Sequence, residues 1–143
     1  MSEAEQVRTG GCRCGAVRYR ATGKPKWVAH CHCSDCRKQT SAGYATWLGY
    51  LTPAVTWEKG PAKEYASSPL VRRSFCGNCG TPIAFVGEHR WPGEVHILAG
   101  TLDDPKSIAP RAHTYMIDAM PWAHVNPADK RFWKTPAEGG PLP

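Results

Sequence analysis

The sequence predicts a mainly β protein with short antiparallel strands in small twisted sheets, stabilised by zinc. Its 143 residues include 14 glycines and 13 prolines, and this content favours turns over long helices. Short segments between the turns alternate apolar and polar residues, as half-buried strands do. Seven cysteines fall into three clusters, a pattern typical of metal sites. The length is that of one domain, which we expect over 1–143 with a core at about 9–125.

The expected elements are short strands with one helical turn among them. Val17–Arg20 alternates apolar and basic residues, which predicts a strand with one solvated face. Ser34–Gln39 is polar and lacks β-branched residues, which favours a helical turn capped by Ser34 or Asp35. The Pro/Gly-rich residues 136–143 predict a loose tail. Further strands are expected at Trp27–Ala29, 44–51, 55–58, 63–66, 71–75, 82–86 and 94–99.

The cysteine spacings suit metal coordination. In an extended strand, residues i and i+2 point to the same face about 7 Å apart along the backbone, so a Cys-x-Cys pair can present two sulfurs to one ion. A tight turn brings the sulfurs of a Cys-x-x-Cys pair together, and Gly77 and Gly80 permit such a turn. The three clusters are Cys12-x-Cys14, Cys31-x-Cys33-x-x-Cys36 and Cys76-x-x-Cys79.

The seven cysteines divide most simply into four ligands and three. Four thiolates complete a tetrahedral shell and make a structural zinc site, whereas three leave a position open for water or substrate. The expected structural site joins an early strand to a late turn through Cys12, Cys14, Cys76 and Cys79. The expected open site, which is the candidate catalytic site, is formed locally by Cys31, Cys33 and Cys36.

Two other interpretations of the cysteines are open. A disulfide framework would leave one of the seven thiols unpaired. Residues 1–10 show no secretory signal and the apolar runs are too short to cross a bilayer, so we expect a reducing cytoplasm and no membrane partner.

Alternatively, both metal sites are structural and a histidine is the eighth ligand. His30 and His32 adjoin the cysteines, although His32 would point away from Cys31 and Cys33 in an extended segment. The more distant candidates are His89, His96, His113 and His124.

The net charge does not imply a nucleic-acid partner. The formal charge of +6 counts every cysteine as neutral. Seven thiolates subtract seven and two Zn²⁺ add four, which lowers it to +3. Lys and Arg are scattered, without a run of five or more. The composition gives no prediction of the oligomeric state.

Together the clusters resemble the glutathione-dependent formaldehyde-activating enzyme family, which also contains centromere protein V. Weaker similarities follow in Gly100–Pro105, at His113 and at Trp122. The segments that carry the resemblance are Gly11–Val17, Cys31–Lys38 and Phe75–Pro82.

The resemblance implies a mainly β, Mss4-like fold with two zinc ions bound as the spacing suggests. It also implies a carbon-sulfur lyase that joins formaldehyde to glutathione and yields S-hydroxymethylglutathione. An open zinc lowers the pKa of a bound thiol and polarises a carbonyl. Three thiolates make the zinc a weaker Lewis acid, which favours delivery of a bound thiolate over strong carbonyl activation.

Glutathione, as a co-substrate, carries two carboxylates that basic side chains could bind. Arg13, Arg37 and Lys38 flank the cysteines and are the candidate contacts. Trp122 is a candidate for the pocket near the open metal, and His113 for a partner of that site or a core residue. The sequence favours an enzyme that acts on a small thiol or aldehyde. The alternative is a non-catalytic zinc module that binds protein or nucleic acid.

Overall fold

The computed structural model describes residue 2 and residues 6–143, in two compact units. The first unit contains the chain up to Trp27 and Leu48–Ser107, and the second contains Val28–Trp47 and Ile108–Pro143. The chain therefore enters each unit twice. The expectation of one domain over 1–143 stays a prediction.

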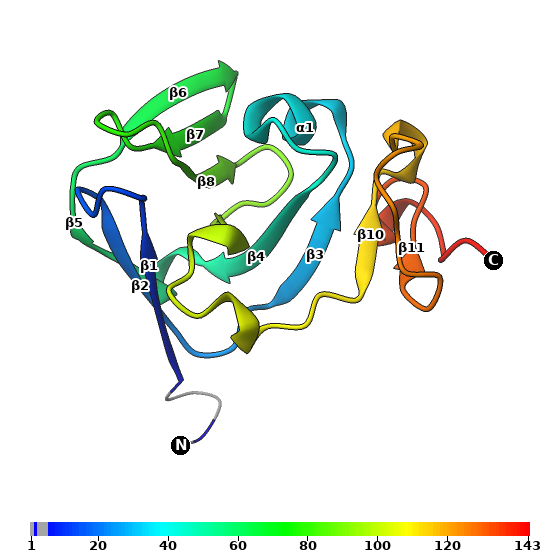
Figure 1. The fold of residues 1–143 in the computed structure, drawn as a ribbon, viewed down its shortest axis with the longest axis horizontal. Helices are drawn as coiled ribbons and strands as arrows, with labels where there is room; N and C mark the ends of the chain where they lie inside the picture. The colour runs from blue at the N-terminus through cyan, green and yellow to red at the C-terminus, as the bar shows by residue number, and fades with distance from the viewer. Residues whose placement is uncertain (1, 3–5) are drawn as a thin grey trace. The chain divides into compact units, whose positions relative to one another are not determined.

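A small antiparallel sheet opens the first unit. β1 (Val7–Gly11) pairs with β2 (Arg18–Thr22), which pairs in turn with β5 (Val55–Lys59) (Figure 1). The alternation predicted for β2 is confirmed, because Tyr19 and Ala21 are fully buried while Arg18 and Arg20 are not. Tyr19 Oη lies 2.7 Å from Thr101 Oγ1, which satisfies the buried hydroxyl.

A meander of four antiparallel strands forms the larger part of the first unit. Its order is β6 (Lys63–Ser68), β7 (Val71–Phe75), β8 (Pro82–Gly87) and β9 (Glu94–Leu98), and consecutive strands are neighbours in the sheet. Figure 1 shows β6, β7 and β8 side by side. β9 is buried along its whole length, so it lies in the core of this unit. The predicted strands are confirmed at Lys63–Ser68, Val71–Phe75, Pro82–Gly87 and Glu94–Leu98.

The second unit contains parallel pairing that the sequence analysis did not predict. β10 (Ala112–Thr114) pairs in parallel with β3 (Trp27–Cys31) and with β11 (Lys130–Arg131). β4 (Ala45–Leu51) begins in this unit and ends in the first. α1 (Ser34–Thr40) follows β3 directly and confirms the predicted helical turn. Short 3₁₀ turns complete the described chain at Thr52–Ala54, Ala99–Thr101, Pro105–Ser107, Met116–Asp118 and Pro136–Glu138.

Two local expectations need correction. The cap of α1 is Cys33, and neither Ser34 nor Asp35, because the Cys33 sulfur accepts the N–H of Cys36 at 3.2 Å. Cys12 and Cys14 lie in the turn between β1 and β2, not in an extended strand. The Gly15 N–H donates to the Cys12 carbonyl at 3.2 Å and Gly15 has a φ of 82°, a turn geometry that glycine adopts without strain.

The predicted tail over 136–143 has contacts of its own. The N–H of Leu142 donates to the Arg131 carbonyl at 2.6 Å, and the Arg131 side chain donates to the Pro143 carbonyl at 2.8 Å. Among the described residues, no helix is both long and apolar enough to cross a membrane.

We expect Gly49→Ala to destabilise the protein by about 1–3 kcal/mol through overpacking. Gly49 is buried in β4, and a Cβ there would lie 2.2 Å from the Trp27 indole. Gly100→Ala is the matched control, because no atom lies within 4 Å of its Cβ position. Urea denaturation should leave Gly100→Ala within about 0.5 kcal/mol of the parent. Equal midpoints for the two variants would contradict the packing of Trp27 on β4.

Candidate functional site

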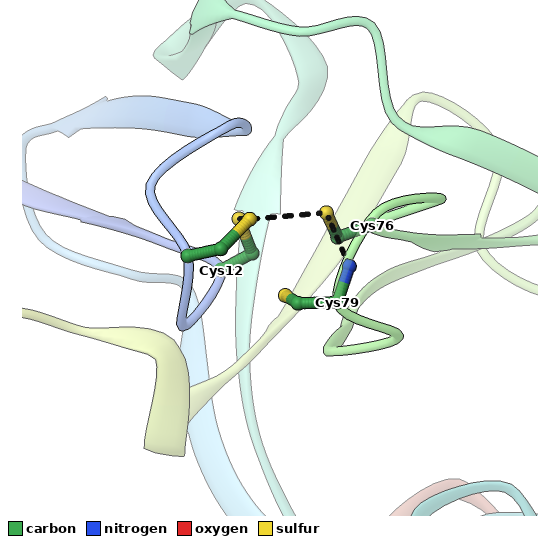
Figure 2. A group of neighbouring side chains, drawn as sticks. Cys12, Cys76 and Cys79 are labelled. Atoms are coloured by element: carbon green, nitrogen blue, oxygen red, sulfur yellow. Dashed lines mark hydrogen bonds between the residues drawn. The ribbon is translucent and has the colours of Figure 1, made fainter.

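Four cysteine sulfurs converge from two turns of the first unit. Cys12 and Cys14 come from the β1–β2 turn, and Cys76 and Cys79 from the turn before β8. Figure 2 shows Cys12 facing Cys76 and Cys79. The sulfurs of Cys12 and Cys14 are 3.6 Å apart, those of Cys14 and Cys76 are 3.8 Å apart, and all four lie within 4.8 Å of one another. Zn–S bonds of about 2.3 Å in a tetrahedron place sulfurs about 3.8 Å apart. The donor set therefore fits a zinc ion.

Backbone and side-chain N–H groups point at these sulfurs. The N–H of Val17 donates to Cys12 at 3.2 Å, and Asn78 donates its backbone N–H to Cys76 at 3.3 Å and its side-chain amide to Cys14 at 3.2 Å. The Thr81 hydroxyl and backbone lower the pKa of Cys79 to about 5. Donors of this kind favour thiolate over thiol, which is the form that binds metal.

The second cysteine group is local. Cys31 ends β3, Cys33 caps α1 and Cys36 is buried in the first turn of that helix. The three sulfurs lie within 4.8 Å of one another, and no histidine or carboxylate of the described chain joins them. The group can therefore supply three soft ligands to one ion and leave a fourth position open.

Neighbouring thiols set the protonation of this group. Hydrogen bonds from the Cys31 and Cys36 thiols lower the pKa of Cys33 to about 3. The contact with Cys33 raises the pKa of Cys31 to about 11, and contacts with Cys31 and Cys33 also raise the pKa of Cys36. Without a cation, ionisation of Cys33 is therefore favoured over that of its two neighbours. A divalent ion would take the place of the two thiol protons.

The three basic candidates lie in different places. Arg37 and Lys38 are on α1, directly after Cys36, whereas Arg13 lies between Cys12 and Cys14 in the first unit. The Nε of Arg37 is buried and has no hydrogen-bond partner among the described residues. Lys38 is exposed. Arg37 therefore carries a buried donor without a partner on the same helix as Cys36.

Trp122 belongs to the second unit and is 63% exposed. Its ring packs over Gly43, where a Cβ would lie 2.9 Å from the indole. The structure thus offers an exposed aromatic surface near the end of α1. A cavity of about 330 Å³, lined by residues of the first unit that include Arg8, Thr9 and Asp103, contains no cysteine.

His32 and His113 form a buried pair, and the sequence did not predict their contact. His32 points away from the cysteine sulfurs, and its Nε2 lies 2.8 Å from His113 Nδ1. Burial lowers the pKa of His32 to about 4, so its imidazole is neutral. The two histidines are 81 residues apart, and only the pairing of β10 with β3 brings them together. Alternation along one strand could predict the direction of His32 but not its partner.

Fold and cysteine geometry thus define a small, mainly β protein with two thiolate groups suited to metal. The family model described as "Glutathione-dependent formaldehyde-activating enzyme" matches residues 7–118. The chain belongs to this family, which confirms the resemblance read from its cysteine clusters.

Named relatives agree with this assignment. A Halomonas elongata protein called "Putative glutathione-dependent formaldehyde-activating enzyme" is 32% identical over 126 residues, covering 81% of this chain and 79% of its own. An uncharacterized lyase of Schizosaccharomyces pombe is 34% identical over 76 residues, covering 53% of this chain and 55% of its own. The match thus spans about half the length of the S. pombe protein.

A solved structure supports the fold. The crystal structure of a Rhodobacter sphaeroides protein is similar with a TM-score of 0.56 and 22% identity, covering 72% of this chain and 92% of its own. The mainly β architecture of short strands is therefore confirmed.

Cys76→Ser should lower stability by several kcal/mol or prevent folding, because loss of one ligand would release a metal that ties two distant turns together. Thermal melting and metal analysis of the purified variant check this. A soluble variant with the parent's melting temperature and full metal content would contradict the grouping.

Cys33→Ser should stay folded and lose about one zinc per chain relative to the parent, because its group joins no distant segments. Serine can still cap α1, whereas Cys33→Ala should cost about 1 kcal/mol more by removing the cap. If Cys33→Ser unfolds as readily as Cys76→Ser, the second site is structural too.

Proposed function

We propose that the protein is a zinc-dependent carbon-sulfur lyase that joins a small aldehyde to a thiol, with formaldehyde and glutathione as the reference pair. The observation that carries the proposal is the three-cysteine group at the β3–α1 junction, which has no fourth ligand among the described residues. The family and the name of the H. elongata relative support the choice of reaction.

Both cysteine groups would hold zinc. Cys12, Cys14, Cys76 and Cys79 would form the closed structural site, and Cys31, Cys33 and Cys36 the open one. When bound at the open site, zinc supplies a Lewis acid that lowers the pKa of a thiol beside it. The free state of all seven cysteines fits a reducing compartment such as the cytoplasm.

The reaction needs the thiol and the aldehyde to be held together. A bond forms between the thiol sulfur and the carbonyl carbon, the carbonyl π bond breaks, and the proton of the thiol ends on the oxygen. Because no electrons are gained or lost, no redox partner is required. The task of the protein residues is to bind the thiol substrate, exclude competing nucleophiles and reduce the entropic cost of a bimolecular step.

Arg37 is the residue proposed to bind glutathione. Its buried, unpartnered Nε lies on the same helix as Cys36 and can donate to a carboxylate. Lys38 would contribute a solvated positive charge from the exposed side of α1. Arg13 lies in the turn of the four-cysteine group, so we expect it to contribute less than Arg37 to binding of the thiol substrate. The exposed Trp122 ring would cover the apolar part of the substrate.

The proposal is tested with ¹³C-labelled formaldehyde and glutathione. Exchange NMR should show faster formation of S-hydroxymethylglutathione with the zinc-loaded parent than in buffer alone. Cys33→Ser should return the rate to the buffer value while the protein stays folded. No acceleration by the parent, together with tight and salt-sensitive binding to nucleic acid, would favour the non-catalytic module instead.

Arg37→Ala should weaken glutathione binding by about 1–3 kcal/mol, because the contact between Arg37 and a glutathione carboxylate is lost. The binding of mercaptoethanol should stay nearly unchanged, because mercaptoethanol has no carboxylate. Cobalt in place of zinc reports both thiols through the thiolate-to-metal absorption. Arg37→Lys is the matched variant, because it keeps the charge and loses the planar donor pair. Equal weakening of the binding of both thiols would show that Arg37 does not recognise a carboxylate of glutathione.

A further inference from the structure

The second unit holds a third group of metal-type ligands, and this one contains no cysteine. His30 on β3, His113 on β10 and Asp129 just before β11 place one nitrogen or oxygen atom each within 4.8 Å of one another. We infer that these three residues form a binding site for a divalent transition-metal ion, separate from the two cysteine groups.

The spacing of His113 and Asp129 suits two ligands of one ion. His113 Nε2 and Asp129 Oδ2 are 3.2 Å apart. Bonds of about 2.0–2.1 Å to nitrogen and oxygen in a tetrahedral site place the two ligand atoms about 3.3 Å apart. Both side chains are buried, with 2% and 7% of their surface exposed. A buried imidazole and carboxylate that face each other in this way can accept a cation with little rearrangement.

Neighbouring residues already orient the ligands. The Arg111 Nε donates to Asp129 Oδ1 at 2.8 Å, which leaves Oδ2 directed at His113. Thr46 orients the His30 ring, because its Oγ1 lies 2.8 Å from His30 Nδ1. Ligating histidines and carboxylates in proteins are oriented by second hydrogen bonds of this kind.

The strand register brings His30 and His113 together. The two residues are direct partners in the parallel pairing of β3 with β10, and their ring centroids are 4.4 Å apart. The site is therefore built into the backbone of the second unit, since β10 also pairs with β11 directly after Asp129.

His32 completes the arrangement as a positioning residue. Its Nε2 is 2.8 Å from His113 Nδ1, and its Nδ1 is buried without a partner among the described residues. With an ion on His113 Nε2, the proton of His113 would sit on Nδ1 and be donated to His32. Without the ion, His32 Nε2–H can donate to His113, whose Nε2–H then donates to Asp129. The two states differ in tautomer and not in net protonation of the histidine pair.

The donor set also separates this site from the cysteine groups. Two imidazoles and a carboxylate are borderline to hard ligands that suit Zn²⁺, Co²⁺ and Ni²⁺, whereas thiolate groups are soft. Water would complete the shell, as in other sites with three protein ligands.

The test uses the full chain loaded with two equivalents of zinc, which the soft thiolate groups bind first, and titrates it with Co²⁺. One equivalent should bind and give visible ligand-field bands without the near-ultraviolet thiolate-to-cobalt bands. Asp129→Asn should weaken this binding by about 100-fold, and Arg111→Gln by about 10-fold because it only orients the carboxylate. His124→Gln is the control, since His124 is exposed in the same unit and belongs to none of the ligand groups among the described residues.

Absence of sulfur-free cobalt bands in the parent would overturn the inference. So would equal Co²⁺ affinity in the parent and Asp129→Asn. A second test needs no variant and therefore holds even if a variant fails to fold. In the parent, ¹⁵N NMR should show the His113 ring changing tautomer as the ion is added. A His113 ring that stays protonated on Nε2 at saturating Co²⁺ or Zn²⁺ would equally contradict the site. Neither result depends on lyase activity.

Discussion

The close approach of cysteine sulfurs is the constraint on which the rest of the structure depends. Sulfurs 3.6 to 3.8 Å apart in the first unit can ionise together only if a cation lies between them. Hydrogen bonds from Val17 and Asn78 lower the cost of negative charge there but do not cancel it. The turns that hold these sulfurs follow β1 and precede β8, so their geometry is coupled to the sheets of that unit.

The same chemistry has a different consequence in the second unit. Cys31, Cys33 and Cys36 span six residues, and their sulfurs are placed by the end of β3 and the cap of α1. Local geometry, without help from distant turns, therefore fixes this group. A metal group that does not link distant segments of the chain needs no fourth protein ligand for stability. Its fourth coordination position can then remain open.

Much of the fold could be predicted from the sequence, because local residue patterns determine many of its strands and its helix. Alternation located β2, and the polar segment after Cys33 located α1. Two local predictions were wrong. The cap of α1 is a cysteine sulfur and not a hydroxyl or carboxylate oxygen. The expected strand at Cys12 and Cys14 is a turn, in which Gly15 adopts a positive φ. β10 has only three residues, and its parallel pairing depends on contacts about 80 residues distant. No periodicity could indicate it.

The histidine network follows from that same long-range pairing. The alternation that directs the Cys31 and Cys33 sulfurs toward each other places His32 on the other side of the segment, where β10 supplies His113. The backbone between the two cysteines is held as well, because the His32 N–H donates to the Thr114 carbonyl at 3.0 Å. One strand end thus carries two groups of candidate ligands of different softness. The backbone that positions Cys31 and Cys33 is also the backbone that places His30 beside His113.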